Sequence, residues 1–259
     1  MEMNREMNLI QAEQARAKTK MLATIPDTEL VSLSSENVAL VEAMIQNDSA
    51  YLRTSDKAAV PTTKYGGSTA YWMTRLKAVL IGGEYASDLQ YRQILLGAIE
   101  AVDRENSTHL NADGIGREEL LGRLVSIERE KLITYLKEPD RTDLWLINFL
   151  AKTTHPTGVS PKGSRYKART NPSFASKFCH YACFYLFEGE EWQDNYSIYD
   201  NVLQKVMPEY VKYYGLKQRD LSIYAEYRKT VDEIIGKAED PISRNGFDHL
   251  LWYYFKGRI

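Results

Sequence analysis

The sequence predicts an all-α fold, a globular bundle of roughly ten helices. Apolar residues recur at helical spacing through most of the 259 residues, and no stretch alternates in the way a half-buried strand does. Glycine, proline and short polar stretches separate the periodic segments. We therefore expect the burial of amphipathic helix faces to supply most of the stability.

Composition places the chain with ordinary globular proteins, because 44% of its residues are apolar and 26% are charged. A chain of this length can bury about three quarters of its unfolded surface without a disulfide or a metal. Cys179 and Cys183 stand four apart in an apolar run, which is typical of reduced core thiols. No apolar run reaches the roughly 18 residues of a membrane span, and the stretch Met1 to Met21 lacks the apolar core of a secretory signal. We expect a cytoplasmic protein without membrane contact.

The first 60 residues are expected to form a helical appendage and a linker. A polar helix is predicted between Met1 and Lys20, and Ser34 or Ser35 can cap a second helix with an apolar stripe through Val41. The stretch from Ser49 to Ser68 is rich in Asp, Ser, Thr and Gly, which is typical of a linker. The main helical domain is then expected over residues 61–259.

Within that domain, periodicity predicts helices over 71–81, 87–99, 117–135, 144–151, 173–187, 199–206, 221–236 and 246–255. A polar loop is expected over 103–116 and a long loop over 153–170. Asp140 or Thr142 is expected to cap the helix over 144–151. Pro208 is expected to end or kink the helix that begins at 199.

Charge segregation is the first functional signal. No Asp or Glu occurs between Leu144 and Phe187, and the basic residues of this window are Lys152, Lys162, Arg165, Lys167, Arg169 and Lys177. A basic loop that leads into a helix N-terminus is a reasonable phosphate-binding surface, and Tyr166 could stack on a base. The alternative is a solvated loop on a protein whose net charge is only −2.

Two ionisable residues are further candidates, one inside this window and one after it. Lys177 stands in the first turns of an apolar helix, where partial loss of solvent could make it an amine nucleophile. Asp200 stands where an apolar extended stretch becomes a helix, and it could face a cleft as a carboxylate. The plainer interpretations are a lysine that extends to solvent and an aspartate that caps its helix.

Together these features resemble the helix-hairpin-helix DNA glycosylase superfamily, whose pattern is Leu-Pro-Gly-x-Gly-x-Lys, an apolar helix, and Val-Asp at the next helix start. Pro172, Lys177 and Asp200 match the proline, the catalytic lysine and the catalytic aspartate of that pattern. Ser176 to Tyr181 and Tyr196 to Val202 look similar to divergent bacterial 8-oxoguanine DNA glycosylase-like proteins. The two hairpin glycines are replaced by Ser173 and Ala175, and Glu188 to Asp194 lengthen the following loop.

The resemblance implies a DNA glycosylase, with or without AP-lyase activity, that flips a damaged or modified base out of duplex DNA. It implies Lys177 as the amine nucleophile and Asp200 as the carboxylate that stabilises charge on the sugar. The implied DNA contacts are Lys162, Arg165, Lys167, Arg169, Ser173 and Ser176. His180 could line the base pocket or be a core histidine, and no cofactor is implied.

Other patterns are less informative. Gly114-Ile115-Gly116 could form a small phosphate-binding turn, and the Cys179, His180 and Cys183 set lacks a fourth ligand at a metal-site spacing, so no metal is expected. Two alternatives to a glycosylase stay open. One is a non-catalytic nucleic-acid-binding protein on the same scaffold, and the other is a phage- or defence-related helical interaction protein.

Overall fold

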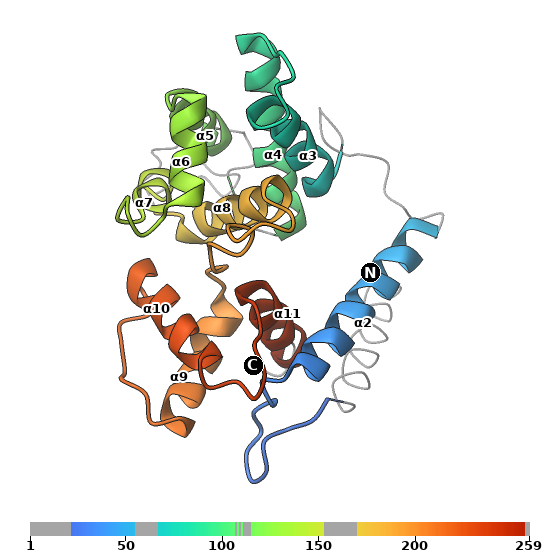
Figure 1. Ribbon diagram of the computed structural model, residues 1–259, viewed down its shortest axis with the longest axis vertical. Coiled ribbons are helices and arrows are strands. Elements are labelled where there is room, and N and C mark those ends of the chain that lie inside the picture. The colour runs from blue at the N-terminus through green and yellow to red at the C-terminus, as the bar shows by residue number, and fades with distance from the viewer. Residues whose placement is uncertain are drawn as a thin grey trace, which may run out of the picture. The chain divides into compact units, whose positions relative to one another are not determined.

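A computed structural model describes residues 22–54, 67–106, 108, 110, 115–152 and 170–256 (Figure 1). Every regular element in these ranges is a helix, and their only β pairing is an isolated bridge between Thr24 and Val31. The prediction of an all-α fold is therefore confirmed. None of the described helices has the length and apolar character needed to cross a membrane.

The chain divides into two compact units. Residues 1–58 and 199–259 form one unit, and residues 59–198 form the other. The sequence predicts no boundary between Ile198 and Tyr199. This boundary separates the two predicted catalytic residues, because Lys177 belongs to one unit and Asp200 to the other.

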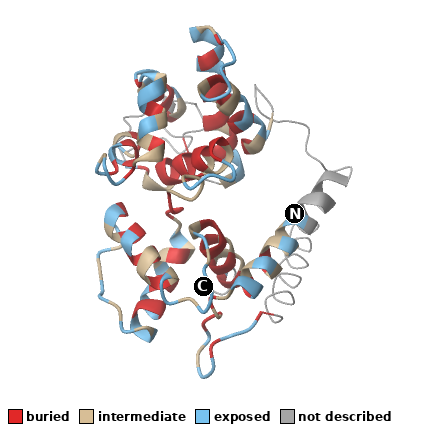
Figure 2. Ribbon diagram, in the orientation of Figure 1, coloured by how far each residue is buried: buried red, intermediate tan, exposed pale blue. Residues whose placement is uncertain are grey.

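The unit formed by residues 59–198 is organised around one buried helix, α8 (Pro172–Leu186). It packs against α3, α4, α6 and α7. Figure 2 shows α8 as largely buried along its length. A helix enclosed on most of its circumference must be apolar nearly all round, which explains the composition of this stretch. The other helices of the unit are α3 (Thr69–Leu80), α4 (Asp88–Asn106), α5 (Ile115–Val125), α6 (Arg129–Lys137) and α7 (Trp145–Leu150).

Helices α3 and α4 approach closely at one point. A Cβ atom added to Gly97 of α4 would lie 2.4 Å from the indole ring of Trp72 on α3. Trp72, Leu76 and Val79 form the buried side of α3, as the apolar spacing predicts. Glycine at position 97 therefore allows the close packing of this helix pair.

The single helix predicted over 117–135 is wrong, because the structure has two helices, α5 and α6. The break lies between Ser126 and Glu128. The Ser126 hydroxyl donates to the Arg123 carbonyl over 2.7 Å, which offers that carbonyl a partner outside the helical ladder. Ile127 remains buried at the break, so apolar periodicity continues across it and conceals it in the sequence.

The predicted cap of the helix over 144–151 is also wrong. The residue before α7 is Leu144, which has a left-handed backbone (φ 53°) and makes no side-chain cap. The Thr142 hydroxyl instead donates to the Glu138 carbonyl over 2.9 Å, so it serves the end of the preceding helix. Leu144 itself is buried, which offsets part of the cost of its backbone conformation.

The second unit contains α2 (Ser35–Thr54), α9 (Asn201–Tyr213), α10 (Tyr224–Ile235) and α11 (Arg244–Phe255). Helix α11 packs against α2, α9 and α10. The Tyr210 hydroxyl of α9 donates to the Val31 carbonyl over 2.7 Å and ties the segment before α2 to the core. Helix α2 extends to Thr54, so the linker predicted from Ser49 starts too early. The helix predicted between Met1 and Lys20 lies outside the described residues.

Pro208 does not end its helix, because α9 continues to Tyr213. A proline within a helix removes one hydrogen bond to the carbonyl four residues earlier. That carbonyl belongs to Gln204, and Pro208 itself is exposed. The lost bond therefore lies where water can satisfy the carbonyl, and the buried face of α9 through Val206 and Tyr210 is unaffected.

Candidate functional site

Lys177 is a buried lysine in the second turn of α8. Its residue is 7% exposed, and its neighbours on both sides, Ser176 and Phe178, are fully buried. The Nζ atom donates to the backbone carbonyl of Asn106 over 3.2 Å. Lysine is almost never buried to this extent in folded proteins, because removing an ammonium group from water is costly. Of the two interpretations of Lys177, the structure therefore favours partial loss of solvent over a side chain that extends to solvent.

The partner of Lys177 is the C-terminal residue of α4. Asn106 ends that helix, and its carbonyl is one of the helix-terminal acceptors that lack an intrahelical partner. A cation at such a helix end also interacts favourably with the helix dipole. The contact therefore gives Lys177 a structural role in addition to any chemical one.

The side chain of Asn106 is fixed by two further contacts. Its Nδ2 donates to the Val102 carbonyl over 3.1 Å, and its Oδ1 accepts from the Tyr181 hydroxyl over 2.9 Å. Because a backbone carbonyl can only accept, the first contact assigns the amide orientation and the second agrees with it. Tyr181 lies one helical turn after Lys177, so both residues of α8 contact the same residue of α4.

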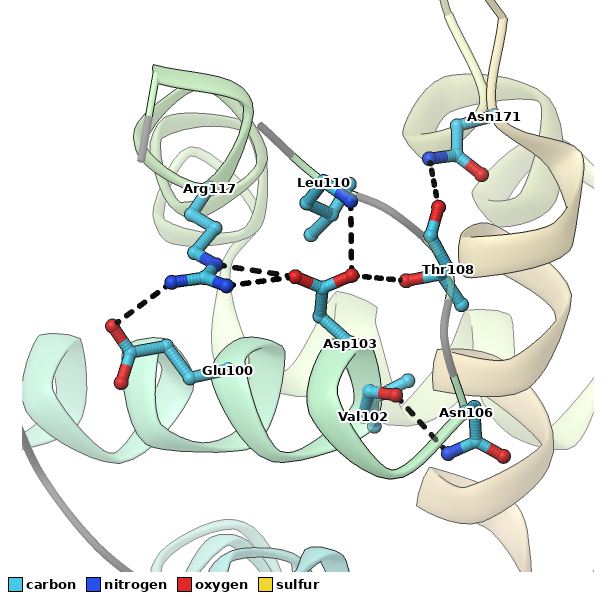
Figure 3. A network of polar contacts seen from close by, with 8 residues as sticks. All are labelled: Glu100, Val102, Asp103, Asn106, Thr108, Leu110, Arg117 and Asn171. Carbon is cyan, nitrogen blue, oxygen red and sulfur yellow. Dashed lines mark hydrogen bonds and ion pairs between the residues drawn. The ribbon is translucent and has the colours of Figure 1, made fainter. Parts of the chain in front are cut away.

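A buried carboxylate, Asp103, organises the chain that follows α4 (Figure 3). Its Oδ1 accepts from the Thr108 hydroxyl over 2.7 Å and from the Leu110 amide over 2.9 Å. Its Oδ2 accepts from Arg117 Nη2 over 2.8 Å, and Arg117 Nη1 lies 3.8 Å from Glu100 Oε1. Sequence reasoning missed this network, which holds the segment directly after Asn106.

The start of α8 is set by Asn171 and Pro172. Asn171 Oδ1 accepts from the Phe174 amide over 3.0 Å, and Pro172 occupies the first turn, where its missing N–H is not needed. Figure 3 shows the Asn171 side chain directed at Thr108, whose carbonyl lies 3.5 Å from Nδ2. The Phe174 amide, one of the N–H groups at the start of this helix, is thus already occupied.

The two serines predicted as DNA contacts differ in exposure. Ser173 is half-buried, whereas Ser176 is fully buried and its hydroxyl donates to the Ser173 carbonyl over 3.1 Å. Ala175, which replaces the second hairpin glycine, is also fully buried. A phosphate contact by Ser173 stays a prediction, and one by Ser176 would require that side chain to become exposed.

Asp200 caps α9. Its Oδ1 accepts from the Val202 amide over 2.7 Å, with the extended backbone that this cap requires. Asp200 also acts on Lys256: burial lowers the pKa of Lys256, and the negative charge of Asp200 opposes that change. The Nζ atom of Lys256 lies 3.7 Å from the centre of the Trp252 ring. The plainer interpretation of Asp200, a helix cap, is confirmed, and the catalytic role stays a prediction.

His180 is a core residue of α8 in this structure. It is 1% exposed, and its Nδ1 lies 2.8 Å from the Tyr196 carbonyl. Since a carbonyl only accepts, Nδ1 carries the hydrogen in the tautomer that this contact favours. Cys179 and Cys183 are buried free thiols, and burial raises the pKa of Cys179 well above its ordinary value. In the part of the chain that the structure describes, no three His, Cys, Asp or Glu side chains are grouped to hold a metal ion.

The acid-free window from Leu144 to Phe187 consists of two helices and the segment between them. Helix α8 is largely buried and half of the residues of α7 are buried, and burial disfavours acidic residues in such segments. The basic residues predicted to contact DNA lie between these helices and fall outside the described residues: Lys162, Arg165, Lys167 and Arg169, with Tyr166. Gly114 of the Gly-x-Gly turn is outside them too. The predicted phosphate contacts in this window therefore depend on residues 153–169, which the structure does not describe.

No family model matches the chain, and neither a curated protein nor a solved structure matches it significantly.

Proposed function

We propose that this chain is a DNA glycosylase with AP-lyase activity that acts on a damaged or modified base in duplex DNA. The observation that carries the proposal is the burial of Lys177. An apolar side chain of similar length, such as methionine, would fill the same space without the several kcal/mol that burying an ammonium ion costs. The contact with the Asn106 carbonyl offsets part of that cost, and the proposed chemistry accounts for a lysine here in place of an apolar residue.

The proposed reaction uses base flipping followed by amine attack. The nitrogen lone pair of Lys177 forms a bond to the sugar C1′ while the bond from C1′ to the base breaks. The base leaves with that electron pair and takes up a proton. Opening of the sugar ring then gives a C1′=N Schiff base, and removal of a C2′ proton expels the 3′ phosphate.

Asp200 has two tasks in this proposal. Its carboxylate stabilises the positive charge that grows on the sugar, and it accepts the proton that the Lys177 amine loses. The proposal requires both groups to reach one sugar although they belong to different compact units. The basic residues of 153–169 would supply sequence-independent phosphate contacts.

Borohydride trapping tests the proposal. The protein is incubated with duplexes that carry an abasic site, 8-oxoguanine or another modified base, and the Schiff base is reduced to a stable adduct. We expect an adduct with the native chain and none with Lys177→Met, whose thermal unfolding is recorded to show that it is folded. Lys205→Met, at an exposed lysine on α9, is the matched control and should form the adduct normally.

Two outcomes would contradict this assignment. Alkali-labile strands without an adduct would show base excision by water and would remove Lys177 as the nucleophile. Neither product on any duplex would overturn the catalytic proposal as a whole.

A second candidate, a non-catalytic nucleic-acid-binding protein, is favoured by one observation. Lys177 serves the end of α4 and Asp200 serves the start of α9, so both have structural contacts. Binding of undamaged duplex at several salt concentrations tests this candidate, because phosphate contacts make affinity fall steeply with salt. Salt-dependent binding without base excision would support it, and salt-independent binding would oppose both candidates.

A further inference from the structure

The environment of the Lys177 amine includes two residues that no motif singles out. Lys177 and Tyr181 stand four apart on α8, so they project from the same face of the helix. Both meet Asn106: the amine bonds its backbone carbonyl over 3.2 Å, and the Tyr181 hydroxyl bonds its Oδ1 over 2.9 Å. One residue of α4 is thus held at two points by one face of α8.

We infer that Asn106 and Tyr181 are positioning residues for the Lys177 amine. The Asn106 carbonyl holds the amine, and the Tyr181 hydroxyl keeps Asn106 in the place where that carbonyl faces the amine. The catalytic consequence rests on the proposed function, whereas the positioning itself does not.

The segment after Asn106 strengthens this assignment. Asp103, one turn before Asn106, binds Thr108 and Leu110, which follow it (Figure 3). Asn106 therefore lies between two fixed points, and its own Nδ2 bonds the Val102 carbonyl. A carbonyl at a helix end that is constrained in this way gives the flexible lysine side chain a defined acceptor position.

Tyr181→Phe tests the inference, because it removes one hydroxyl and keeps the ring. The readout is the rate at which acetic anhydride labels the Lys177 amine, measured by peptide mass spectrometry against exposed Lys205 in the same sample. Losing one hydrogen bond should raise the relative labelling of Lys177 between about twofold and about tenfold. Thermal unfolding is recorded in parallel to show that the variant is folded.

Tyr185→Phe is the matched control. Tyr185 lies one turn further along α8, and its hydroxyl makes no hydrogen bond to another residue that the structure describes. We expect this variant to label Lys177 at the native rate. An equal change in both variants, or no change in Tyr181→Phe, would overturn the inference.

A double variant tests whether the two residues act through one another. Asn106→Ala keeps the backbone carbonyl and removes the acceptor of the Tyr181 hydroxyl. If both residues hold the amine by a single chain of contacts, Asn106→Ala with Tyr181→Phe should label Lys177 no faster than Asn106→Ala alone. Multiplied effects would show that Tyr181 does not act through Asn106 and would contradict the inference.

The reaction supplies a separate readout. With a saturating abasic duplex, Tyr181→Phe should slow borohydride trapping by about two- to tenfold while the duplex Kd stays unchanged. A change in Kd with an unchanged trapping rate would contradict a positioning role. If the native chain forms no adduct, the proposed function fails, and the labelling rates still decide whether Asn106 and Tyr181 position the amine.

Discussion

Lys177 and Asp200 both bind a helix end, but their surroundings differ. Asp200 accepts the Val202 amide at the start of its own helix, a contact that asparagine or serine makes equally well. Lys177 donates to the end of another helix, and it is 7% exposed among apolar neighbours. Local structure therefore explains a short polar side chain at 200, whereas the lysine at 177 carries a helix-end contact at a position that is otherwise buried.

The strongest test of this difference changes the charge of a capping side chain and keeps its hydrogen-bond acceptor. Asp200→Asn keeps the acceptor for Val202 and removes the carboxylate, while Asn171→Asp keeps the acceptor for Phe174 and adds one. We expect Asp200→Asn to slow trapping roughly 100-fold or more, as loss of a group that handles protons does. Thermal unfolding should change little in either variant.

Asn171→Asp should keep most of the activity, because the proposed chemistry does not use Asn171. If Asp200→Asn traps the abasic duplex as fast as the native chain, then Asp200 is a cap and nothing more.

The network beside Lys177 should matter mainly for stability. Asp103→Ala removes the acceptor of Thr108, Leu110 and Arg117, and it should lower the free energy of unfolding by about 1–3 kcal/mol. Urea denaturation measures this directly. A loss below about 0.5 kcal/mol, within the range of ordinary surface substitutions, would show that the network does not hold the segment after α4.

The smallest effects are expected from removing the two caps. Asp200→Ala and Asn171→Ala each leave one helix-terminal amide without its side-chain acceptor and should cost about 1 kcal/mol. Comparison with Asp200→Asn and Asn171→Asp in urea separates the cap from the charge. An asparagine at 200 that destabilises as much as alanine would mean that the charge of Asp200, not its cap, supports the fold.

Much of the helical pattern could be predicted from the sequence, because apolar spacing and capping residues are local signals. Helices α3, α8 and α11 lie close to their expected ranges for this reason. The break between α5 and α6 could not be predicted, since buried Ile127 continues the apolar pattern through it. The expected end of the helix at Pro208 was wrong, because a proline on the exposed side of a helix costs less than one on the buried side.

The candidate site was predictable only in part. The apolar residues around Lys177 left open whether the amine is partly buried or extends to solvent, and its partner Asn106 lies 71 residues away in the sequence and leaves no local signal. Asp103 did leave one: it stands four residues after Ile99 on the buried side of α4, where an apolar residue is expected. An acid at such a position indicates a buried partner, here Arg117.

The central claim is that the Lys177 amine attacks the sugar, and the most direct test is to locate the reduced adduct. Trypsin does not cut after a modified lysine, so an adduct at Lys177 gives a peptide over residues 170–205 that carries the nucleotide. We predict that peptide as the main adduct from an abasic duplex. An adduct at the N-terminal amine or at another lysine would contradict the claim.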